Sequence, residues 1–543
     1  MNVPAALRRP VASAALLLVL LAGLTLLMDP EGTLGTDTGA KVLTLEVMHR
    51  GDTVEPGVPY WAETWDPDGV VHPLYQASQN DDGDWVIVTT MPVLQAARPL
   101  YDLGGYRATL LLPILGTLAC ALAGRALARR LGDADGMLAF WVVGAGSPLL
   151  LYALDFWEHS IGVAACAWAV VALLDALDDR GWWRPVVAGA LLGAAATLRT
   201  EALVYALVSV LVVVVVLVRR REVGRAVATG ALAILGFVPP WLANRWLEAA
   251  VGGLSRGDRA TGAAGTTGAR LGDRAHQALV TTFGMKGESN GSIVIGVAVV
   301  LVVLLAVRAQ QRGDRRLATV ALVLAALPYL VGAISGLSFV PGLVAALPLA
   351  VLAVVHRPRG RASVVLAVAL GALPVVWMTS YVGGGGPQWG SRYTLTSTLL
   401  LAVVATVDLT RRHPVVARGV LALTFGVSAL SVVWLGVRSR SVDHLFVELR
   451  AVEADVLIAR NPFLVREGGA AVVDEQWLSV NSEDAFQVAV RVAEQSGART
   501  VAVVEYEAAA PPPEVIPTDW TEVERTETEL TGTPIGVVVY ALP

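Results

Sequence analysis

Long apolar stretches separated by short polar connections dominate the sequence from residue 10 to residue 440. A helix that crosses a bilayer needs about 20 mostly apolar residues, and on that criterion the pattern predicts about thirteen such helices. Their centres fall near residues 20, 117, 146, 168, 191, 209, 235, 300, 326, 347, 370, 400 and 425. The pattern therefore predicts an all-α polytopic membrane domain over residues 1–440.

The first apolar stretch, residues 11–28, is followed by a large polar loop over residues 29–105. The stretch is either a signal peptide or a retained first helix. No small-x-small cleavage site precedes its polar exit at residues 29–32, and this favours a retained helix.

The pattern changes after residue 440, where strand-like and amphipathic stretches replace the long apolar ones. "AAVVDEQ", "RTVAVVEYE" and "PIGVVVYALP" are typical of strands, and "SEDAFQVAVRVAEQSG" is typical of an amphipathic helix. The proline-rich "EAAAPPPEVIP" predicts a loop between the last two strands. Residues 441–543 are therefore expected to form a small α/β domain.

Charge placement predicts the orientation of the chain. Only 16% of the residues are charged, where a soluble protein of this size has about 25%. With the N-terminus inside, every arginine cluster falls on the cytoplasmic side, as the positive-inside rule requires. An odd number of helices then places the C-terminus outside, in a plasma (inner) membrane protein. These clusters lie at residues 8–9, 125–130, 180–184, 219–225, 308–316, 357–361 and 411–418.

The other polar residues near helix ends collect on the predicted outer side. They are, in chain order, Asp37 and Lys41; Asp155, Glu158 and His159; Arg199 and Glu201; and Gln388, Trp389, Arg392 and Tyr393. Ionisable groups beside hydrocarbon are costly and usually mark a function. These residues are our candidates for catalysis and substrate binding.

Each group also has a purely structural interpretation. Asp37 can cap a helix that begins beside it, and "DFWEHS" can be a solvated hairpin between two helices. Arg199 and Glu201 can mark a short break between packed helices, and Trp389 and Tyr393 can be interfacial belt residues. Arg392 is the exception, because a cation on the outer side runs against the positive-inside bias.

The sequence predicts no cofactor; a divalent metal stays an open alternative, but no convincing set of ligands supports one. The two cysteines, Cys120 and Cys166, both lie in apolar stretches without metal-ligand spacing and are read as small core residues. No glycine-rich phosphate loop lies near the cytoplasmic side. Nucleic acid is not expected as a partner either.

Taken together, these motifs resemble the GT-C superfamily of membrane glycosyltransferases, in particular its protein-mannosyltransferase and aminoarabinose-transferase branch. The likeness covers residues 10–440. Its motifs are "GTDTGAKVLTLEVMHRGD" after the first helix, "TTMPVLQAARPLYDLGGYRA" where the family has "YPPGY", "LDFWEHSIG", "LRTEAL", and "WGSRY", similar to the family's "W-G-x-R-Y". An exported C-terminal α/β domain is also similar to family usage.

The resemblance implies transfer of a sugar from a polyprenyl-phosphate donor to an extracytoplasmic glycan, lipid or protein, within a membrane-lipid environment. It implies inversion at the anomeric carbon with a carboxylate base. Asp37 is expected to be the base, with Asp155, Glu158 and His159 positioning the acceptor or assisting proton transfer. Arg199 and Arg392 are expected to bind the phosphate, and Lys41, Glu201, Gln388, Trp389 and Tyr393 to complete the substrate site.

Two other functions remain open on the sequence. A polytopic transporter or flippase of lipid-linked sugars would carry ionisable residues near the bilayer midplane and an internal repeat. An assembly protein would use its exported C-terminal domain to bind a partner. Few midplane charges and no visible repeat favour the glycosyltransferase.

Overall fold

The fold is described from a computed structural model that covers residues 9–29, 35–80, 82–87, 89–178, 181–252, 271–285, 289–355, 358–379, 389–412, 414–506 and 516–543. The chain forms two compact units. The helical unit comprises residues 1–25, 110–244 and 265–434, and the sheet unit comprises residues 26–109, 245–264 and 435–543.

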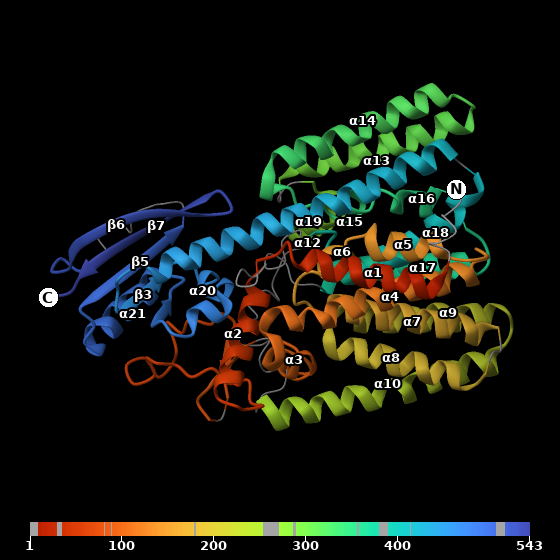
Figure 1. Ribbon diagram of the computed structural model, residues 1–543. Coiled ribbons are helices and arrows are strands. Elements are labelled where there is room, and N and C mark those ends of the chain that lie inside the picture. The colour runs from red at the N-terminus through yellow and green to blue at the C-terminus, as the bar shows by residue number, and fades with distance from the viewer. Residues whose placement is uncertain are drawn as a thin grey trace. The chain divides into compact units, whose positions relative to one another are not determined.

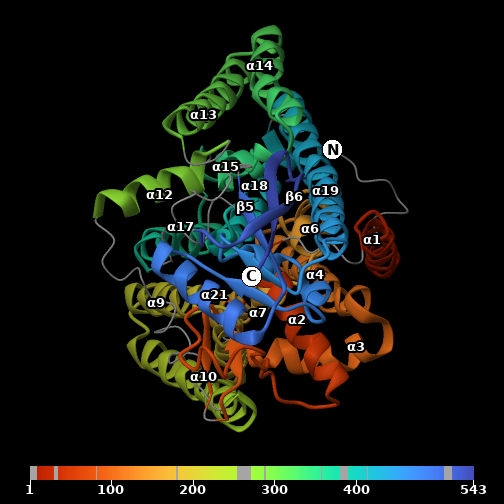
Figure 2. The same cartoon turned by 90° about the vertical axis from the view of Figure 1, so that its left-hand side faces the viewer.

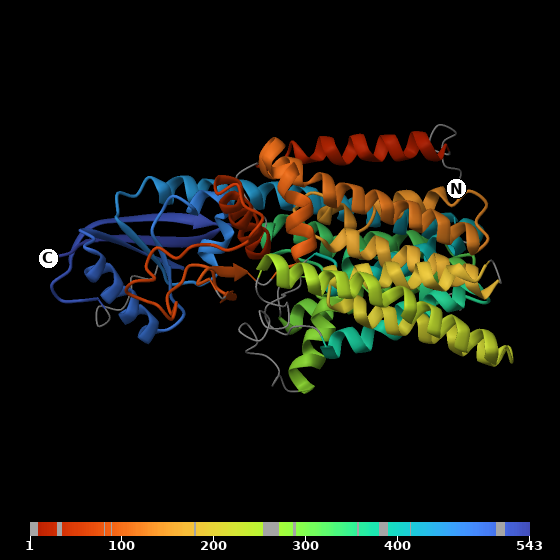
Figure 3. The same cartoon turned by 90° about the horizontal axis from the view of Figure 1, so that it is seen from below.

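Helices with short connections build the helical unit, and α4, α7, α8 and α9 run side by side in it (Figures 1 and 3). The division between the units falls inside α10 and α19. The elements are α1 (Pro10–Thr25), α4 (Leu111–Arg130), α5 (Met137–Ala145), α6 (Leu149–Tyr152), α7 (His159–Leu177), α8 (Trp183–Leu198), α9 (Glu201–Arg219), α10 (Val223–Gly252), α12 (Leu271–Phe283), α13 (Asn290–Gln311), α14 (Arg315–Ile334), η2 (Gly336–Ser338), α15 (Leu343–Ala346), α16 (Ala350–Val355), α17 (Arg361–Thr379), η3 (Arg392–Thr394), α18 (Leu395–Arg412) and α19 (Pro414–Arg450).

Eight helices in the described part of the chain are long and apolar enough to cross a membrane: α4, α7, α9, α10, α13, α14, α17 and α19. Three further apolar helices, at Pro10–Thr25, Trp183–Leu198 and Arg392–Val407, are shorter. The chain is therefore a multi-pass membrane protein. The predicted count of about thirteen spans is not confirmed.

Each predicted centre, apart from two, falls inside a continuous helix of its own. At the two exceptions, the helix is interrupted beside a proline. The centre near residue 146 lies between α5 and α6, just before Pro148, and the centre near residue 347 lies between α15 and α16, beside Pro348. Proline has no backbone N–H and pushes the preceding residue out of the helical region. Hydropathy alone does not reveal such breaks.

The sheet unit joins elements from both ends of the sequence. Its N-terminal part contains α2 (Thr36–Arg50), a hairpin of β1 (Ala77–Gln79) with β2 (Trp85–Ile87), and α3 (Met91–Thr109). Its C-terminal part contains β3 (Val456–Ala459), α20 (Leu464–Glu467), η4 (Gly469–Val472), β4 (Trp477–Ser479), α21 (Glu483–Ser496), β5 (Thr500–Tyr506), β6 (Thr521–Leu530) and β7 (Thr533–Ala541). The sheet order is β4-β3-β5-β7-β6, parallel from β4 to β5 and antiparallel beyond.

Both faces of this sheet are covered, as the alternation of its strands requires. Ile458, Val503 and Val538 pack with α21 on one face, which Figure 2 shows beside the sheet. The neighbouring residues Leu457 and Ala502 pack on the other face, in a core shared with the end of α19 and with α2. The first loop therefore shares a hydrophobic core with the C-terminal residues.

The predicted C-terminal α/β domain is present, with α21, β5 and β7 where the sequence placed a helix and two strands. The predicted strand "AAVVDEQ" is wrong, because η4 occupies its first half and β4 begins only at Trp477. Most of the loop "EAAAPPPEVIP" lies outside the described residues. The domain division at residues 440 and 441 stays a prediction.

Candidate active site

The sharp turn between α6 and α7 is organised by Asp155. One carboxylate oxygen of Asp155 accepts a hydrogen bond from the backbone N–H of Phe156 at 2.7 Å, and the other accepts from the indole N–H of Trp157. The side chain is buried. A buried carboxylate needs such donors, so Asp155 shapes the loop from which Glu158 and His159 project.

Arg199 lies between two carboxylates where α8 ends and α9 begins. Its backbone is extended there, and Gly162 on α7 leaves space for its side chain. Its guanidinium lies 2.9 Å from Glu158 Oε1 through Nη1 and 2.9 Å from Glu201 Oε1 through Nε. The three side chains are 12%, 5% and 9% exposed, respectively. Such desolvated charges persist only when they are paired, so this cluster joins α7, α8 and α9.

Glu201 has an oxygen that these contacts do not use. Among the described residues, Glu201 Oε2 is buried and has no hydrogen-bond partner. A buried acceptor without a donor is costly, and each case needs an explanation. A hydroxyl group of a bound substrate would satisfy it.

Arg392 enters the same region from the turn before α18. It follows Ser391, whose φ is 60°, and it is buried. Its Nη2 donates to the hydroxyl of Tyr393 at 2.9 Å, and its guanidinium lies 4.8 Å from the centre of the Tyr393 ring and 5.5 Å from that of Trp157. Arg199 lies 5.4 Å from the same Tyr393 ring. The Tyr393 ring therefore contacts the guanidinium groups of both arginines. Such a contact holds a guanidinium in place without neutralising its charge.

Aromatic contacts tie the turn that carries Arg392 to the loop that carries Glu158. His159 stacks on Tyr152 at 5.1 Å and contacts the Trp157 ring at 4.6 Å. The hydroxyl of Tyr152 donates to the carbonyl oxygen of Trp389 at 3.2 Å. These contacts bring loops that are far apart in sequence into one polar cluster inside an apolar unit.

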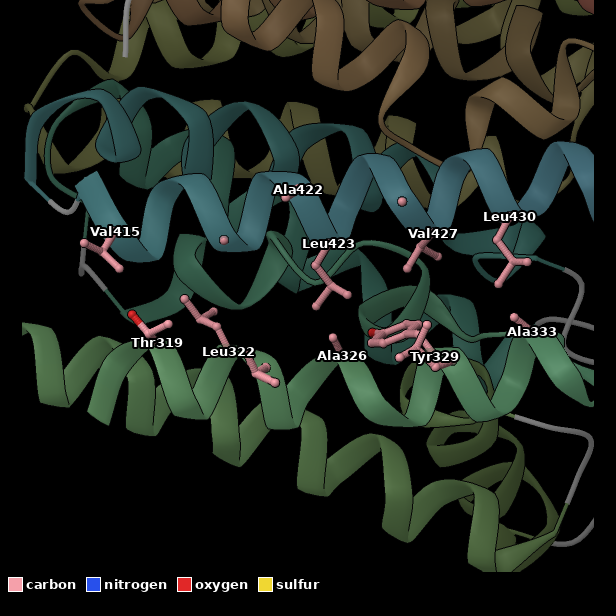
Figure 4. Close-up of a pocket in the computed structure, with 14 residues that line it drawn as sticks. Thr319, Leu322, Ala326, Tyr329, Ala333, Val415, Ala422, Leu423, Val427 and Leu430 are labelled. Carbon is pink, nitrogen blue, oxygen red and sulfur yellow. The ribbon is translucent and has the colours of Figure 1, made fainter. Parts of the chain in front are cut away.

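An apolar groove lies between α14 and α19. Its volume is about 610 Å³, and Figure 4 shows the two helices facing each other across it. The ring of Tyr329, which lines the groove, lies 6.2 Å from Phe339, and Phe339 lies 5.4 Å from Trp389. Side chains that line it include Leu322, Ala326, Ala333, Ala422, Leu423, Val427 and Leu430.

Asp37 and Lys41 lie in the sheet unit, on α2. Asp37 is in the first turn of α2, whose cap residue is Gly35. Its carboxylate pairs with Arg466 of α20 at 3.2 Å. Lys41 is buried one turn later.

The helical unit thus brings together most of the candidates that the sequence named: Asp155, Glu158, His159, Arg199, Glu201, Trp389, Arg392 and Tyr393. Gln388 lies outside the described residues. The sequence reading missed Tyr152, Trp157 and Arg466. Trp157 lies within "DFWEHS", which the sequence analysis had already named, whereas nothing in the sequence around Arg466 distinguishes it from the other arginines of the chain. Within the described residues, no group of three or more His, Cys, Asp or Glu side chains is placed to hold a metal ion.

Comparison with known proteins found structural likeness only. No family model matches the chain, and no curated protein matches it by sequence. The chain is similar to ArnT from Cupriavidus metallidurans bound to undecaprenyl phosphate, with 14% identity, 97% of each chain covered and a TM-score of 0.47. It is also similar to the oligosaccharyltransferase from Archaeoglobus fulgidus in complex with Zn and sulfate, with 14% identity, 90% of this chain and 67% of that chain covered, and a TM-score of 0.47. Another structure of the archaeal enzyme, AglB with an inhibitory peptide and a dolichol-phosphate, has 12% identity and a TM-score of 0.43 over 90% of this chain and 69% of that chain.

Proposed function

We propose that the protein transfers a sugar from a polyprenyl-phosphate donor to a hydroxyl group of an extracytoplasmic acceptor, with inversion at the anomeric carbon. The observation that carries this proposal is the pair of arginines held around the Tyr393 ring: Arg392, which is buried, and Arg199, whose side chain is 12% exposed. Forked guanidinium donors match the oxygens of a phosphate. Cations inside an apolar unit suit a phosphate carried on a hydrocarbon chain.

The phosphate is the leaving group of the reaction. The acceptor oxygen forms a bond to the anomeric carbon as the bond from that carbon to the phosphate oxygen breaks. The departing oxygen keeps the electron pair, and the polyprenyl phosphate gains negative charge. Arg392 and Arg199 stabilise that charge in a site with little water, while Glu158 and Glu201 hold Arg199 in place.

The acceptor proton needs a base, and we assign this role to Asp37. Asp155 has both carboxylate oxygens engaged by donors of its own loop, and Glu158 is paired with Arg199. Asp37 keeps 35% of its side chain exposed, so an acceptor hydroxyl can approach it. His159, Trp389, Lys41 and Gln388 are proposed to line the substrate site, and Glu201 Oε2 to accept a hydrogen bond from a sugar hydroxyl.

The groove between α14 and α19 is proposed to hold part of the polyprenyl chain. Its lining is apolar apart from Thr319 and Tyr329, and ring contacts through Phe339 join it to Trp389. Lipid tails are as apolar as this lining, so such a groove would select donors by how well the chain packs along it and not by removal of the chain from water.

The test is donor turnover in liposomes that contain the purified protein. A panel of undecaprenyl-phosphate hexoses and pentoses is supplied with cell-envelope glycan, lipid and protein fractions as acceptors. The proposal predicts release of undecaprenyl phosphate from at least one donor, and its loss in Arg392→Gln. Movement of intact donors across the bilayer without release would instead support a flippase.

A further inference from the structure

An arginine of the C-terminal part of the sheet unit reaches the proposed base. Arg466, on α20, is only 2% exposed, and its Nη2 lies 3.2 Å from Asp37 Oδ1. Its Nη1 donates to the carbonyl oxygen of Tyr75 at 3.0 Å and to Gln76 Oε1 at 3.3 Å. The guanidinium therefore connects three segments of the chain: α2, the turn before β1, and α20.

Backbone packing fixes Arg466 against α2. A Cβ atom added at Gly39 would lie 1.8 Å from the carbonyl oxygen of Arg466, so only glycine permits this close approach. Glu467, the next residue, pairs with Arg438 of α19. The arginine is thus held from both sides, and its reach to Asp37 is set by the fold of the unit.

The other charges around Asp37 can be named from the elements packed on α2. Lys41 lies one turn along α2 itself, and Glu467 on α20 is taken up by Arg438. The sequence of η4 contains no ionisable residue. On α3, Arg98 and Asp102 contact Asp52 and His49 at the far end of α2. Arg466 is in direct contact with the Asp37 carboxylate.

We propose that Arg466 is a positioning residue for Asp37, so that the C-terminal part of the chain contributes to the active site. The guanidinium holds the carboxylate in one orientation and favours its ionised form, the form that can accept a proton. This inference rests on the proposed function, in which Asp37 is the base. It assigns the exported C-terminal residues a part in the reaction itself.

The experiment compares pH–rate profiles of the wild type, Arg466→Gln, Arg466→Lys and Arg50→Gln, using the undecaprenyl-phosphate sugar that the wild type turns over fastest. Arg50 is a matched control, because it also lies on α2 and pairs with an acidic residue of the C-terminal part, Asp474. We expect Arg466→Gln to lose roughly 100-fold in kcat, as expected for a misplaced catalytic group. Its acidic limb should move up by about 1 pH unit, because an adjacent cation has been removed. Arg466→Lys should recover part of both, and Arg50→Gln should match the wild type.

Two results would overturn the inference. One is an acidic limb in Arg466→Gln that coincides with that of the wild type. The other, if Arg466→Gln does not fold, is a wild-type kcat and pH profile in Arg466→Lys, whose single ammonium cannot reproduce the three contacts of the guanidinium. Asp37→Asn separates the two proposals. Full activity in Asp37→Asn removes the proposed base, whereas inactive Asp37→Asn beside an unaffected Arg466→Gln refutes the role of Arg466 alone.

Discussion

Arg199 and Glu158 form a buried ion pair at 2.9 Å that joins the start of α7 to the break between α8 and α9. The same guanidinium also binds Glu201. One cation thus holds together two carboxylates that would otherwise repel each other in an apolar surrounding. This arrangement makes the stability of the helical unit depend on its candidate active site.

Substitutions within this cluster should destabilise the protein to different extents. Arg199→Gln leaves Glu158 and Glu201 buried without their shared cation, and breaking such a pair costs about 3–5 kcal/mol. Glu158→Gln leaves the Arg199–Glu201 pair in place, so we expect a smaller loss. Thermal unfolding in detergent would rank the two variants.

The control for that ranking is Arg225→Gln. Arg225 pairs with Glu222 in the same unit, but both side chains are about one-third exposed, and such pairs contribute about 0–1 kcal/mol. Equal losses of stability in Arg199→Gln and Arg225→Gln would show that the cluster around Arg199 stabilises the unit no more than an exposed ion pair does.

Tyr393 should separate the contributions of its ring and its hydroxyl. Tyr393→Phe keeps the ring that both arginines contact and loses only the hydrogen bond from Arg392, so donor KM should rise by a few fold, for a loss of about 1 kcal/mol. Tyr393→Ala removes two cation–π contacts, about 0.5–2 kcal/mol each, and should raise donor KM considerably more. Identical KM values for the two variants would argue against ring contacts as the means of holding the arginines.

The apolar groove gives a prediction on chain length. A Cβ added at Gly426 meets nothing within 4 Å, so Gly426→Phe can fill the groove without displacing the backbone. We expect it to raise the KM for an undecaprenyl-phosphate sugar and to leave the KM for a short-chain analogue unchanged. The control is Gly224→Phe, because a Cβ added at Gly224 of α10 also meets nothing within 4 Å. A similar rise in KM in Gly224→Phe would show that the groove does not bind the donor chain.

The burial of His72 should make the stability of the sheet unit sensitive to acid. It is buried beside Trp85, its Nδ1 accepts the N–H of Leu74 at 3.0 Å, and burial lowers its pKa to about 3. Because the folded-state pKa lies below the unfolded value of about 6.5, stability is complete above pH 6.5 and falls as the pH drops toward 3. Between pH 7 and pH 5 the loss is about 2 kcal/mol.

His72→Phe should remove this part of the pH dependence while keeping the stacking on Trp85. Thermal unfolding of the wild type and the variant at pH 7 and pH 5 gives the difference directly. The exposed His444 provides the control variant, His444→Phe, which should retain the wild-type slope. A His72→Phe protein as acid-sensitive as the wild type would rule out the buried imidazole as the cause.

Hydropathy predicted the helical character of the chain because a long apolar stretch is stable inside a bilayer only when its backbone N–H and C=O groups bond to each other, as they do in a helix. It did not reveal the breaks beside Pro148 and Pro348, since apolar residues continue through both of them. The C-terminal elements with clear period-two or helical patterns, such as β5 and α21, were predicted. The highly exposed β6 was missed, because its acidic and threonine-rich sequence carries no apolar alternation.

The candidate site was predicted in part for a similar reason. Charged residues that interrupt apolar stretches, such as Glu158, Arg199 and Arg392, stand out by their cost alone, and the structure brings these three into one cluster. Arg466 could not be found in this way, because its partner Asp37 lies more than 400 residues earlier. Only tertiary packing brings the two together.

Cleavage of a polyprenyl-phosphate sugar at the anomeric carbon is the reaction that we propose for this protein. The most direct measurement is release of undecaprenyl phosphate from sugar-labelled donors in liposomes carrying the wild type, Asp37→Asn or Arg392→Gln at equal protein content. We expect the wild type to transfer label to the acceptor with inverted configuration. We expect Asp37→Asn to lose at least about 100-fold in rate, the order expected for removal of a general base. Equal release by the wild type and Asp37→Asn, or no release from any donor, would contradict the proposal.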